Sequence, residues 1–586
     1  MKIKSLLIGM LACSAMVACT NTDEPEVDNG GAKGNESYLA VKLVNPSAGS
    51  RATGNYAYGS EAEQTVTSAR FYLFDAAGNA YEINDGSNPT NNGKNYVDAT
   101  PSGTFTESGS DNVETVLSTV LVIDSSKKLP PASILAVLNC SDLLDTDNLS
   151  LSQLKIKVAN FGTIKDEKSP APYIGKGKFA MSNSVFVDAA GNLAEATPIA
   201  AENIKTKKED ALKPEAAVEI YVERVAAKVQ TEVSIPTTVT EETKKEGKFF
   251  KIGDEFYANT GEVDANGKDI YAHLLGWRVT NITNQSKLIK DLDGTANANP
   301  ALAWTWNNPA NFRSYWADAN YDPAFVWTFN EATLPFTGNN FEYYNENTKN
   351  ITGNHKESKN SQLLVAAEFV TIDGGVPSAP QAIAEWYGVK YTLNGLRKVV
   401  ADALASKLYT TTDNKTYVSI KPEEITFTQV SEELDDNRYI SKIGVKDQTY
   451  YYKNDEKMAA YDVEGNKTLA SVVDALQTTK IWGNEIKDGE TTTYEGGGYY
   501  YLDIIHNAGT ITKDKEGKIT SDTNVYGLVR NHWYKLTLNK LSGLGTPVYN
   551  PDKVIITETP ETDASFIAAE INVLAWRMVE QGVDLK

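Results

Sequence analysis

At 586 residues the chain is too long for one hydrophobic core, so two or three domains are expected. Its formal net charge of −21 argues against a nucleic-acid-binding protein that works through phosphate contacts. The 30 tyrosines and 9 tryptophans, in tyrosine- and threonine-rich segments separated by Gly, Asn and Asp, predict an all-β protein.

The chain begins with an export signal. A positively charged start, a short apolar run and small residues up to Ala18 give residues 1–18 the pattern of a signal peptide. Cys19 follows directly, so the box Met16–Cys19 suggests a bacterial lipoprotein that is lipidated on this cysteine. Because no later apolar run is long enough to cross a bilayer, this lipid is the only membrane attachment we expect.

A strand and a lone arginine follow the polar tether of the leader. Residues 38–44 alternate as a strand, with Leu39, Val41 and Leu43 on one face. Arg51 then stands in a loop of small residues, the form of an exposed protease site. Two interpretations stay open: an ordinary first strand with its turn, or a strand that is cut away. Cutting it away would leave an open apolar groove that invites a strand from another molecule.

The middle of the chain predicts a domain boundary and two helices. Residues 218–233 form the longest strand pattern of the first half, and its apolar phase changes near Glu223–Arg224. We therefore expect an N-terminal domain over 52–223 and a C-terminal domain over 224–564. Two helically spaced stripes predict small helical additions packed on a sheet of the second domain; they consist of Leu396, Val399, Val400, Ala403, Leu404 and Leu408, and of Leu469, Val472, Val473 and Leu476.

The C-terminal end of the chain predicts an alternating strand, a polar linker and a final apolar segment. In the segment 530–538, the alternation places Tyr534, Leu536 and Leu538 inward. A polar linker over 557–564 then leads to a final apolar segment. That segment, Phe566–Lys586, is expected to form one or two extended strands.

Little in the chain points to catalysis or metal binding. Asp264–Asp269 lacks the alternating acids and the closing glutamate of a calcium loop, so it favours a turn. Gly496–Gly498 precedes a strand, which favours close backbone packing over a phosphate cradle. Cys140 is expected to be a small buried thiol, and His532–Trp533 favours strand core or sheet surface over a ligand site. The four histidines have no metal-ligand spacing, so we predict no enzyme, no cofactor and no metal.

Several segments together resemble a fimbrillin, specifically the short-fimbria (Mfa-type) major subunits of the bacteroidete type V pili. The resemblance extends over nearly the whole chain, and the order and spacing of its segments carry it. These segments are the box Met16–Cys19, the run Val222–Val229, the run Val529–Tyr534 and the C-terminal segment with Ile571, Val573 and Trp576.

The resemblance implies a fold and a maturation route. It implies two tandem transthyretin-like β-sandwiches and a precursor that travels to the outer membrane as a lipoprotein. An arginine-specific surface protease would then cut between Arg51 and Ala52 and remove the propeptide, residues 19–51. Arg70 is a poorer candidate for this cut because it opens an expected core strand. The C-terminal strand of one subunit would fill the vacated groove of the next, with 565–586 as donor strand and Phe566, Ile571, Val573, Leu574, Trp576 and Val579 as its apolar residues.

Three classes of function remain to be separated. The first is a structural shaft subunit of an adhesive cell-surface fimbria, whose partners are copies of itself, anchor and tip subunits and an unidentified adhesion target. A tip or anchor subunit is a variant of this hypothesis. The second is a monomeric outer-membrane lipoprotein that binds glycans through aromatic residues. The third, an enzyme, lacks a catalytic constellation.

Overall fold

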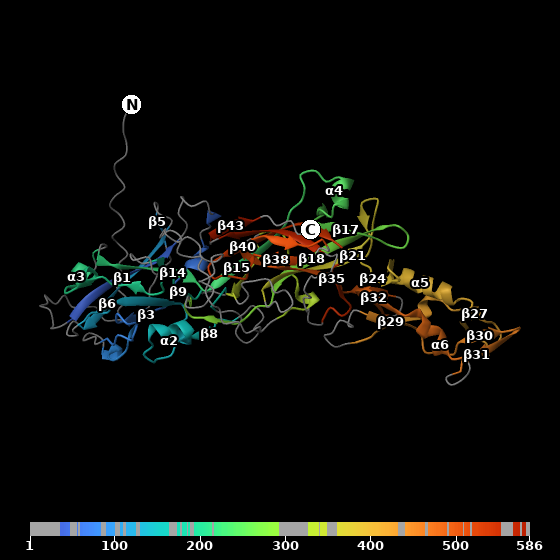
Figure 1. The fold of residues 1–586 in the computed structure, drawn as a ribbon, viewed down its shortest axis with the longest axis horizontal. Helices are drawn as coiled ribbons and strands as arrows, with labels where there is room; N and C mark the ends of the chain where they lie inside the picture. Colours follow the sequence, from blue (N-terminus) through green and yellow to red (C-terminus); the bar gives the residue numbers. More distant parts are fainter. Residues whose placement is uncertain are drawn as a thin grey trace, which may run out of the picture.

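The structure is a computed structural model. It describes residues 36–46, 55–56, 59–83, 89–99, 106–108, 113–124, 129–162, 173–175, 179–184, 186–187, 193–211, 213, 216–291, 326–338, 340–348, 360–431, 440–462, 467–488, 491–507, 509–515, 519–552, 566–574 and 577–581. These residues form mostly β-strands, as the composition predicts. Along the long axis, Figure 1 shows an N-terminal sheet, then a C-terminal sandwich, then a smaller lobe.

The N-terminal part is a ten-stranded sheet. Its main path is β4 (Tyr96–Ala99), β3 (Ala69–Phe74), β7 (Ser133–Leu138), β9 (Met181–Asn183), β14 (Val218–Arg224), β1 (Glu36–Pro46), β6 (Val113–Asp124) and β5 (Thr106–Ser108), with β12 (Thr197–Pro198) on β7 and β13 (Ile204–Lys205) on β1. The first part of β14 pairs with β1 and its last part with β9, so β14 joins the two halves. Both halves contribute to one hydrophobic core, which α2 (Leu151–Ile156) also covers through Leu154.

The C-terminal part is a sandwich of two six-stranded sheets. One contains β2 (Asn55–Tyr56), β43 (Arg577–Gln581), β42 (Phe566–Leu574), β40 (Trp533–Ser542), β15 (Ala226–Val233) and β20 (Phe341–Asn345); the other contains β16 (Phe250–Ile252), β17 (Glu255–Val263), β18 (Asp269–Thr280), β21 (Gln362–Val370), β35 (Gly497–Asp503) and β41 (Thr546–Val548). Tyr534, Leu536 and Leu538 of β40 are fully buried in the core between the sheets, which confirms the predicted alternation.

The triple glycine packs as predicted. A Cβ atom on Gly497 would lie 2.2 Å from the carbonyl oxygen of Ala367, and one on Gly498 would lie 2.1 Å from that of Leu544. Only a residue without a side chain lets β35 approach its neighbours this closely. The prediction of close backbone packing is therefore confirmed.

The lobe, residues 382–482, is larger than the predicted helical additions. Both predicted helices are present, as α5 (Leu393–Leu404) and the short α6 (Leu469–Val473), and Leu396, Val400 and Leu404 of α5 are buried. However, they cover strands that the sequence pattern did not predict. These are β25 (Val389–Thr392), β24 (Ile383–Trp386), β32 (Thr478–Trp482), β29 (Ile440–Val445) and β28 (Ile425–Gln429) in one sheet, and β27 (Val418–Ser419), β26 (Tyr409–Thr410), β30 (Tyr451–Asn454) and β31 (Lys457–Ala460) in another. The lobe has its own hydrophobic core.

The two larger parts meet at one strand-to-strand passage. The chain leaves the N-terminal sheet at Arg224 and enters the sandwich at Ala226, where the sequence showed its change of phase. A second bridge is the antiparallel pair of β8 (Val158–Asn160) and β19 (Gln285–Lys287). Leu288 and Ile289 then enter the core of the N-terminal sheet, so the two parts share packed residues.

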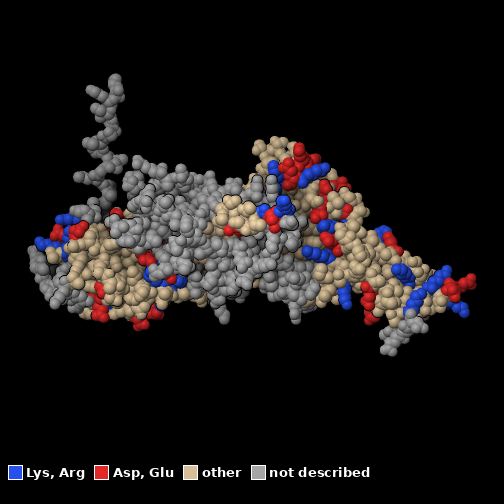
Figure 2. Space-filling view, in the orientation of Figure 1, with Lys and Arg blue, Asp and Glu red and all other residues tan. Residues whose placement is uncertain are grey.

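The surface carries charges of both signs. Figure 2 shows Lys and Arg interspersed with Asp and Glu over the lobe and around α4 (Glu241–Lys245). No helix among the described residues is both long enough and apolar enough to span a membrane.

Candidate functional site

The predicted removable strand is an interior strand of its sheet. β1 runs parallel to β14, with Val41 opposite Val218 and Leu43 opposite Ile220. On its other side β1 runs antiparallel to β6, which it accompanies along its whole length. Both backbone edges of β1 are therefore paired. Its removal would leave β14 and β6 with facing, unpaired edges, separated by the width of one strand.

The core side of this slot is apolar. Leu39 of β1, Ile220 of β14 and Leu121 of β6 are at most 2% exposed and belong to one core. For Val41 and Leu43, the other two residues of the predicted apolar face, the structure describes backbone pairing with β14 and β6. Without β1, the apolar neighbours of Leu39 would meet water, which makes an apolar strand the natural occupant.

The predicted cleavage site lies on the connection between two described strands. Arg51 and Ala52 belong to residues 47–54, which join β1 to β2 and lie outside the described residues. The lipidation site Cys19 also lies outside them. Arg70, the poorer candidate, is buried in β3, where its guanidinium contacts the Asp98 carboxylate at 2.6 Å.

The predicted donor segment pairs with the body of its own chain. β42 runs antiparallel to β40. β42 carries four of the predicted donor residues, Phe566, Ile571, Val573 and Leu574. β43, which carries Val579, folds back on β42. Trp576 lies outside the described residues, between the two strands. We call β42 and β43 together the tail; they form the extended strands that the sequence predicts.

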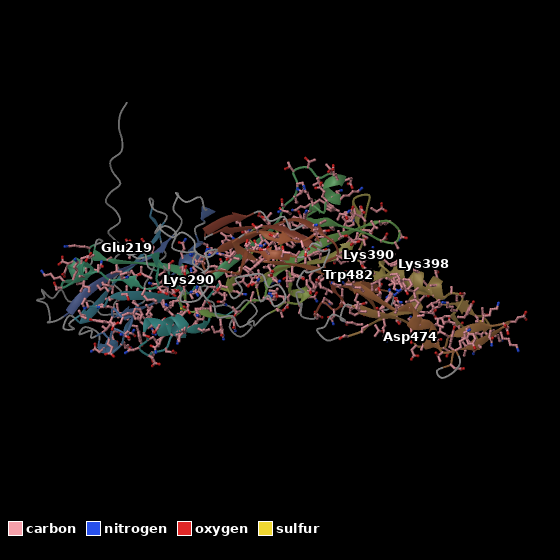
Figure 3. The ribbon with its side chains drawn as sticks, viewed as in Figure 1. Glu219, Lys290, Lys390, Lys398, Asp474 and Trp482 are labelled. Carbon is pink, nitrogen blue, oxygen red and sulfur yellow. The ribbon has the colours of Figure 1, made fainter. Side chains whose placement is uncertain are left out.

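The segment 548–552, which leads to the tail, is held at two points. The carbonyl oxygen of Val548 accepts a hydrogen bond of 2.8 Å from the Gly483 amide. A few residues later, the Asn330 side chain donates to Asp552 at 2.8 Å. Figure 3 labels Trp482 and Lys390 near the junction of the sandwich and the lobe, where Gly483 follows Trp482. Residues 553–565, which follow, would span at most about 45 Å when fully extended.

Two segments that carry the fimbrillin resemblance lie side by side at the passage between the sheets. Lys228 donates its amide to the carbonyl oxygen of His532 at 2.9 Å, and Asn531 donates its amide to that of Ala226 at 2.7 Å. The Arg224 guanidinium donates to the Asn531 side chain at 3.2 Å. The runs 222–229 and 529–534 thus form one structural unit.

Buried charges surround this unit. Glu63, from α1 (Glu61–Gln64), is 1% exposed, and its carboxylate contacts the Lys228 ammonium at 2.9 Å. Tyr343 donates its hydroxyl to the same carboxylate, and Arg224 donates to the Glu63 carbonyl oxygen at 2.6 Å. Burial raises the pKa of Glu63, but the charges of Arg224 and Lys228 outweigh burial and hold this pKa below its ordinary value. The Lys228 ammonium also lies 3.7 Å from the Phe341 ring centre.

Two further buried ion pairs lie close by. Lys290 contacts Glu223 at 3.1 Å, with both side chains fully buried, and Figure 3 shows Lys290 where the two parts meet. Arg530 contacts Glu346 at 2.8 Å, with the two side chains 0% and 1% exposed. Burial raises the pKa of Glu223 to about 7, against the opposing effects of Lys290 and Arg530. These pairs were not predictable from the sequence, because a charged residue in a strand pattern indicates a solvent-facing position. The phase change near Glu223–Arg224 was the one signal available.

The isolated features of the sequence have structural roles. Asp264 closes a turn by accepting hydrogen bonds of 2.9 Å from the amides of Asn266 and Lys268, which confirms the predicted turn. Cys140 is buried and is not in a disulfide, as predicted. His532 is fully buried, with its ring centre 5.0 Å from that of His506. Within the described part of the chain, no three His, Cys, Asp or Glu side chains are arranged to hold a metal ion.

Comparison with known proteins identifies the C-terminal region. Residues 492–582 match the family model described as "Major fimbrial subunit protein type IV, Fimbrillin, C-terminal". This range contains β40 and the tail. No curated protein shows significant sequence similarity to the chain.

Several solved structures are similar over most of the chain. A fimbrilin from Porphyromonas gingivalis W83 is 12% identical, with a TM-score of 0.32, and the match covers 93% of this chain and 98% of that one. The tip fimbrial protein Mfa3 of the same species is 10% identical, with a TM-score of 0.29, over 91% of this chain and 99% of that one. A fimbrial assembly protein from Parabacteroides distasonis ATCC 8503 is 12% identical, with a TM-score of 0.28, over 73% of this chain and 100% of that one.

Because the identities and TM-scores are low in all three cases, these similarities by themselves assign no function to the chain. The resemblance to fimbrillins is confirmed over residues 492–582, which match the family model of the fimbrillin C-terminal region.

Proposed function

We propose that this chain is a structural subunit of a cell-surface fimbria and that it polymerises by strand replacement. It is exported as a lipoprotein on Cys19, cut between Arg51 and Ala52 and joined head to tail with copies of itself. Its two larger parts correspond to the tandem transthyretin-like sandwiches expected from the resemblance. Because it combines a cleavable leader with a C-terminal tail, it acts as a shaft subunit, which meets an anchor subunit at one end of the fimbria and a tip subunit at the other.

The position of β1 is the observation that carries this proposal. β1 is paired on both edges, and the connection that contains Arg51 is its covalent link to the residues that follow. A cut after Arg51 would turn β1 from a covalently attached strand into a non-covalently bound peptide. When that peptide leaves, the facing edges of β14 and β6 become an acceptor for another extended segment.

The tail suits this acceptor on energetic grounds. In its own subunit, β42 pairs with the body of the protein through β40 alone. In the vacated slot it would pair with both β14 and β6, so both of its edges would lie against strands of the next subunit's body. Each apolar side chain that becomes buried adds about 1.5–3 kcal/mol, and the facing edges no longer leave backbone groups unpaired. Ordering of the linker offsets part of this gain.

The geometry produces a chain of subunits. The acceptor slot lies in the N-terminal sheet, whereas β42 and β43 of the tail belong to a sheet of the C-terminal sandwich (Figure 1). A contact between two different surfaces of the subunit leaves one free surface at each end of the assembly. Unless the rotation between neighbouring subunits closes a ring, such contacts propagate into a filament. Before the cut, β1 fills the slot and keeps subunits monomeric during export.

An Arg51→Ala variant tests the proposal. We expect it to reach the cell surface uncut and to form no multimers that survive an unheated denaturing gel. A Lys33→Ala variant is the matched control, because it removes one positive charge from the same leader and leaves the cut intact. Multimers from uncut Arg51→Ala subunits, at the level of the control, would refute strand replacement after cleavage.

A further inference from the structure

The residues just after the predicted cut contact the tail. β2 runs antiparallel to β43, with Asn55 opposite Met578 and Tyr56 opposite Arg577. β2 is the edge strand of its sheet and covers the outer edge of the tail, in the order β2, β43, β42, β40. β2, which would lie near the N-terminus of the mature chain, therefore pairs with the tail, the segment that must leave for another subunit.

β2 is held from both sides in the uncut chain. On its C-terminal side is α1, whose Glu63 is fixed in the buried site formed by Arg224, Lys228 and Tyr343. On its N-terminal side, residues 47–54 connect it to β1, which is paired on both edges. A two-residue strand is weak alone, but two fixed ends keep it close to its partner and raise its effective concentration there.

We propose that β2 is a strap on the tail and that cleavage at Arg51 loosens it. The cut removes the N-terminal anchor, so β2 becomes the frayed end of a chain held only by α1. One event then has two effects: it frees β1 to leave the acceptor slot, and it weakens the contact that retains the tail. Uncut subunits thus keep both slot and tail closed. This inference rests on the proposed strand replacement.

Proline substitutions in the precursor test the strap. Asn55→Pro with Tyr56→Pro removes the amides of β2, while Thr53→Pro with Gly54→Pro places two prolines in the same connection ahead of the paired residues. In the uncut precursor, we expect amide hydrogen exchange at residues 577–581 to rise about five-fold in the first variant, as for the loss of one net hydrogen bond. The control should match the unmodified precursor.

Cleavage supplies the second readout. After an arginine-specific protease has cut each precursor to completion, as shown by intact mass, N55P/Y56P subunits should form multimers faster than T53P/G54P subunits, by less than five-fold because the cut has already loosened β2 in both. In the unmodified protein, the cut itself should raise exchange at residues 577–581. Equal exchange and equal rates in the two proline variants would overturn the strap.

A labelled synthetic peptide of residues 566–581 separates this inference from the proposed function. It reports on the acceptor slot, whatever the state of the subunit's own tail. If the peptide binds all the cleaved proteins equally while the proline variants do not differ, strand replacement stands and the strap fails. If it binds none of the cleaved proteins, strand replacement fails and the strap falls with it.

Discussion

Buried ion pairs at the passage between the sheets are the residues most sensitive to change. Glu223 and Lys290 are both fully buried, so neither charge has water to solvate it. Burial of two charges costs more than their attraction alone returns unless further partners help, whereas removal of one partner leaves an uncompensated charge. Such pairs therefore fix how the two parts of the molecule are joined more than they add to stability.

Lys290→Met should lower the free energy of unfolding by roughly 3 kcal/mol at about pH 8, because Glu223 stays buried without its partner. The penalty should shrink toward about pH 5, since the pKa of Glu223 is raised to about 7 and the lone carboxyl then takes up a proton. Urea unfolding at both pH values measures this change. Lys398→Met, which breaks an exposed pair with Asp402, is the control and should cost less than about 1 kcal/mol. An equal cost for both variants would contradict the prediction.

His273 predicts a second pH dependence. It lies between Glu368 and Glu255 on the sandwich, at 2.8 and 3.1 Å. Burial lowers its pKa, but the hydrogen bonds and charges of the two glutamates outweigh burial and raise it above its ordinary value. A raised pKa in the folded state stabilises the fold below the unfolded pKa, and the contribution disappears as pH rises through the folded pKa.

The difference in unfolding free energy between the unmodified protein and His273→Gln should therefore be larger at about pH 5.5 than at about pH 8.5. Chemical denaturation at the two pH values gives this difference directly. A difference that is constant or that grows with pH would show that His273 stays neutral in the folded protein.

Individual elements differ in how far the sequence determines them. Two elements were predicted correctly from local periodicity, because one face of each packs against a core. They are the strand with Tyr534, Leu536 and Leu538 inward and the helix with Leu396, Val400 and Leu404 on one stripe. The strands of the lobe were missed because short strands such as Tyr451–Asn454 mix polar and aromatic residues and are only half-buried. Their pairing is set by partners distant in sequence.

The candidate site was only partly predictable for the same reason. Leu39 in an apolar strand and Arg51 in a loop of small residues are local signals. That β1 lies between β14 and β6, and that β2 covers the tail, are non-local pairings that no periodicity encodes. Nothing in the local sequence marks Glu63 as buried, because its partners Arg224 and Lys228 lie more than 160 residues away.

Gly498, the second residue of β35, gives a prediction at the same scale. Gly498→Ala should destabilise the protein by roughly 1–3 kcal/mol or more, because the new Cβ would lie 2.1 Å from a backbone carbonyl oxygen that has little freedom to move. Thermal unfolding measures the effect. Gly375→Asn is the control: nothing lies within 4 Å of its Cβ position, and asparagine tolerates its φ of +82°. A stable Gly498→Ala variant would contradict this account of the triple glycine.

The whole molecule is a row of packed parts. The N-terminal sheet and the sandwich share buried charges, a bridging strand pair and core residues, so we expect them to move as one body. The lobe is joined differently. The chain enters and leaves it through paired strands, with Ile383 opposite Trp482 and Glu385 opposite Lys480, so its two ends lie together.

Excision of the lobe should therefore leave a folded, polymerising subunit. Joining Glu385 to Lys480 through an Asn-Gly turn keeps the β24–β32 pair and also keeps Ile383 and Trp482 in the sandwich core. Circular dichroism should show a folded β protein, and multimers should form after cleavage at the rate of the intact chain. A folded variant that no longer forms multimers would instead place the lobe in the contact between subunits.

The central claim is that the tail of one subunit takes the place of β1 in the next. Intact mass and peptide mapping of subunits in sheared fibres test it most directly. The account predicts chains that begin at Ala52 and fibres from which residues 36–46 are absent. Fibres whose subunits retain residues 36–46, either attached or as a bound fragment, would contradict it, because the acceptor slot would still hold its original strand.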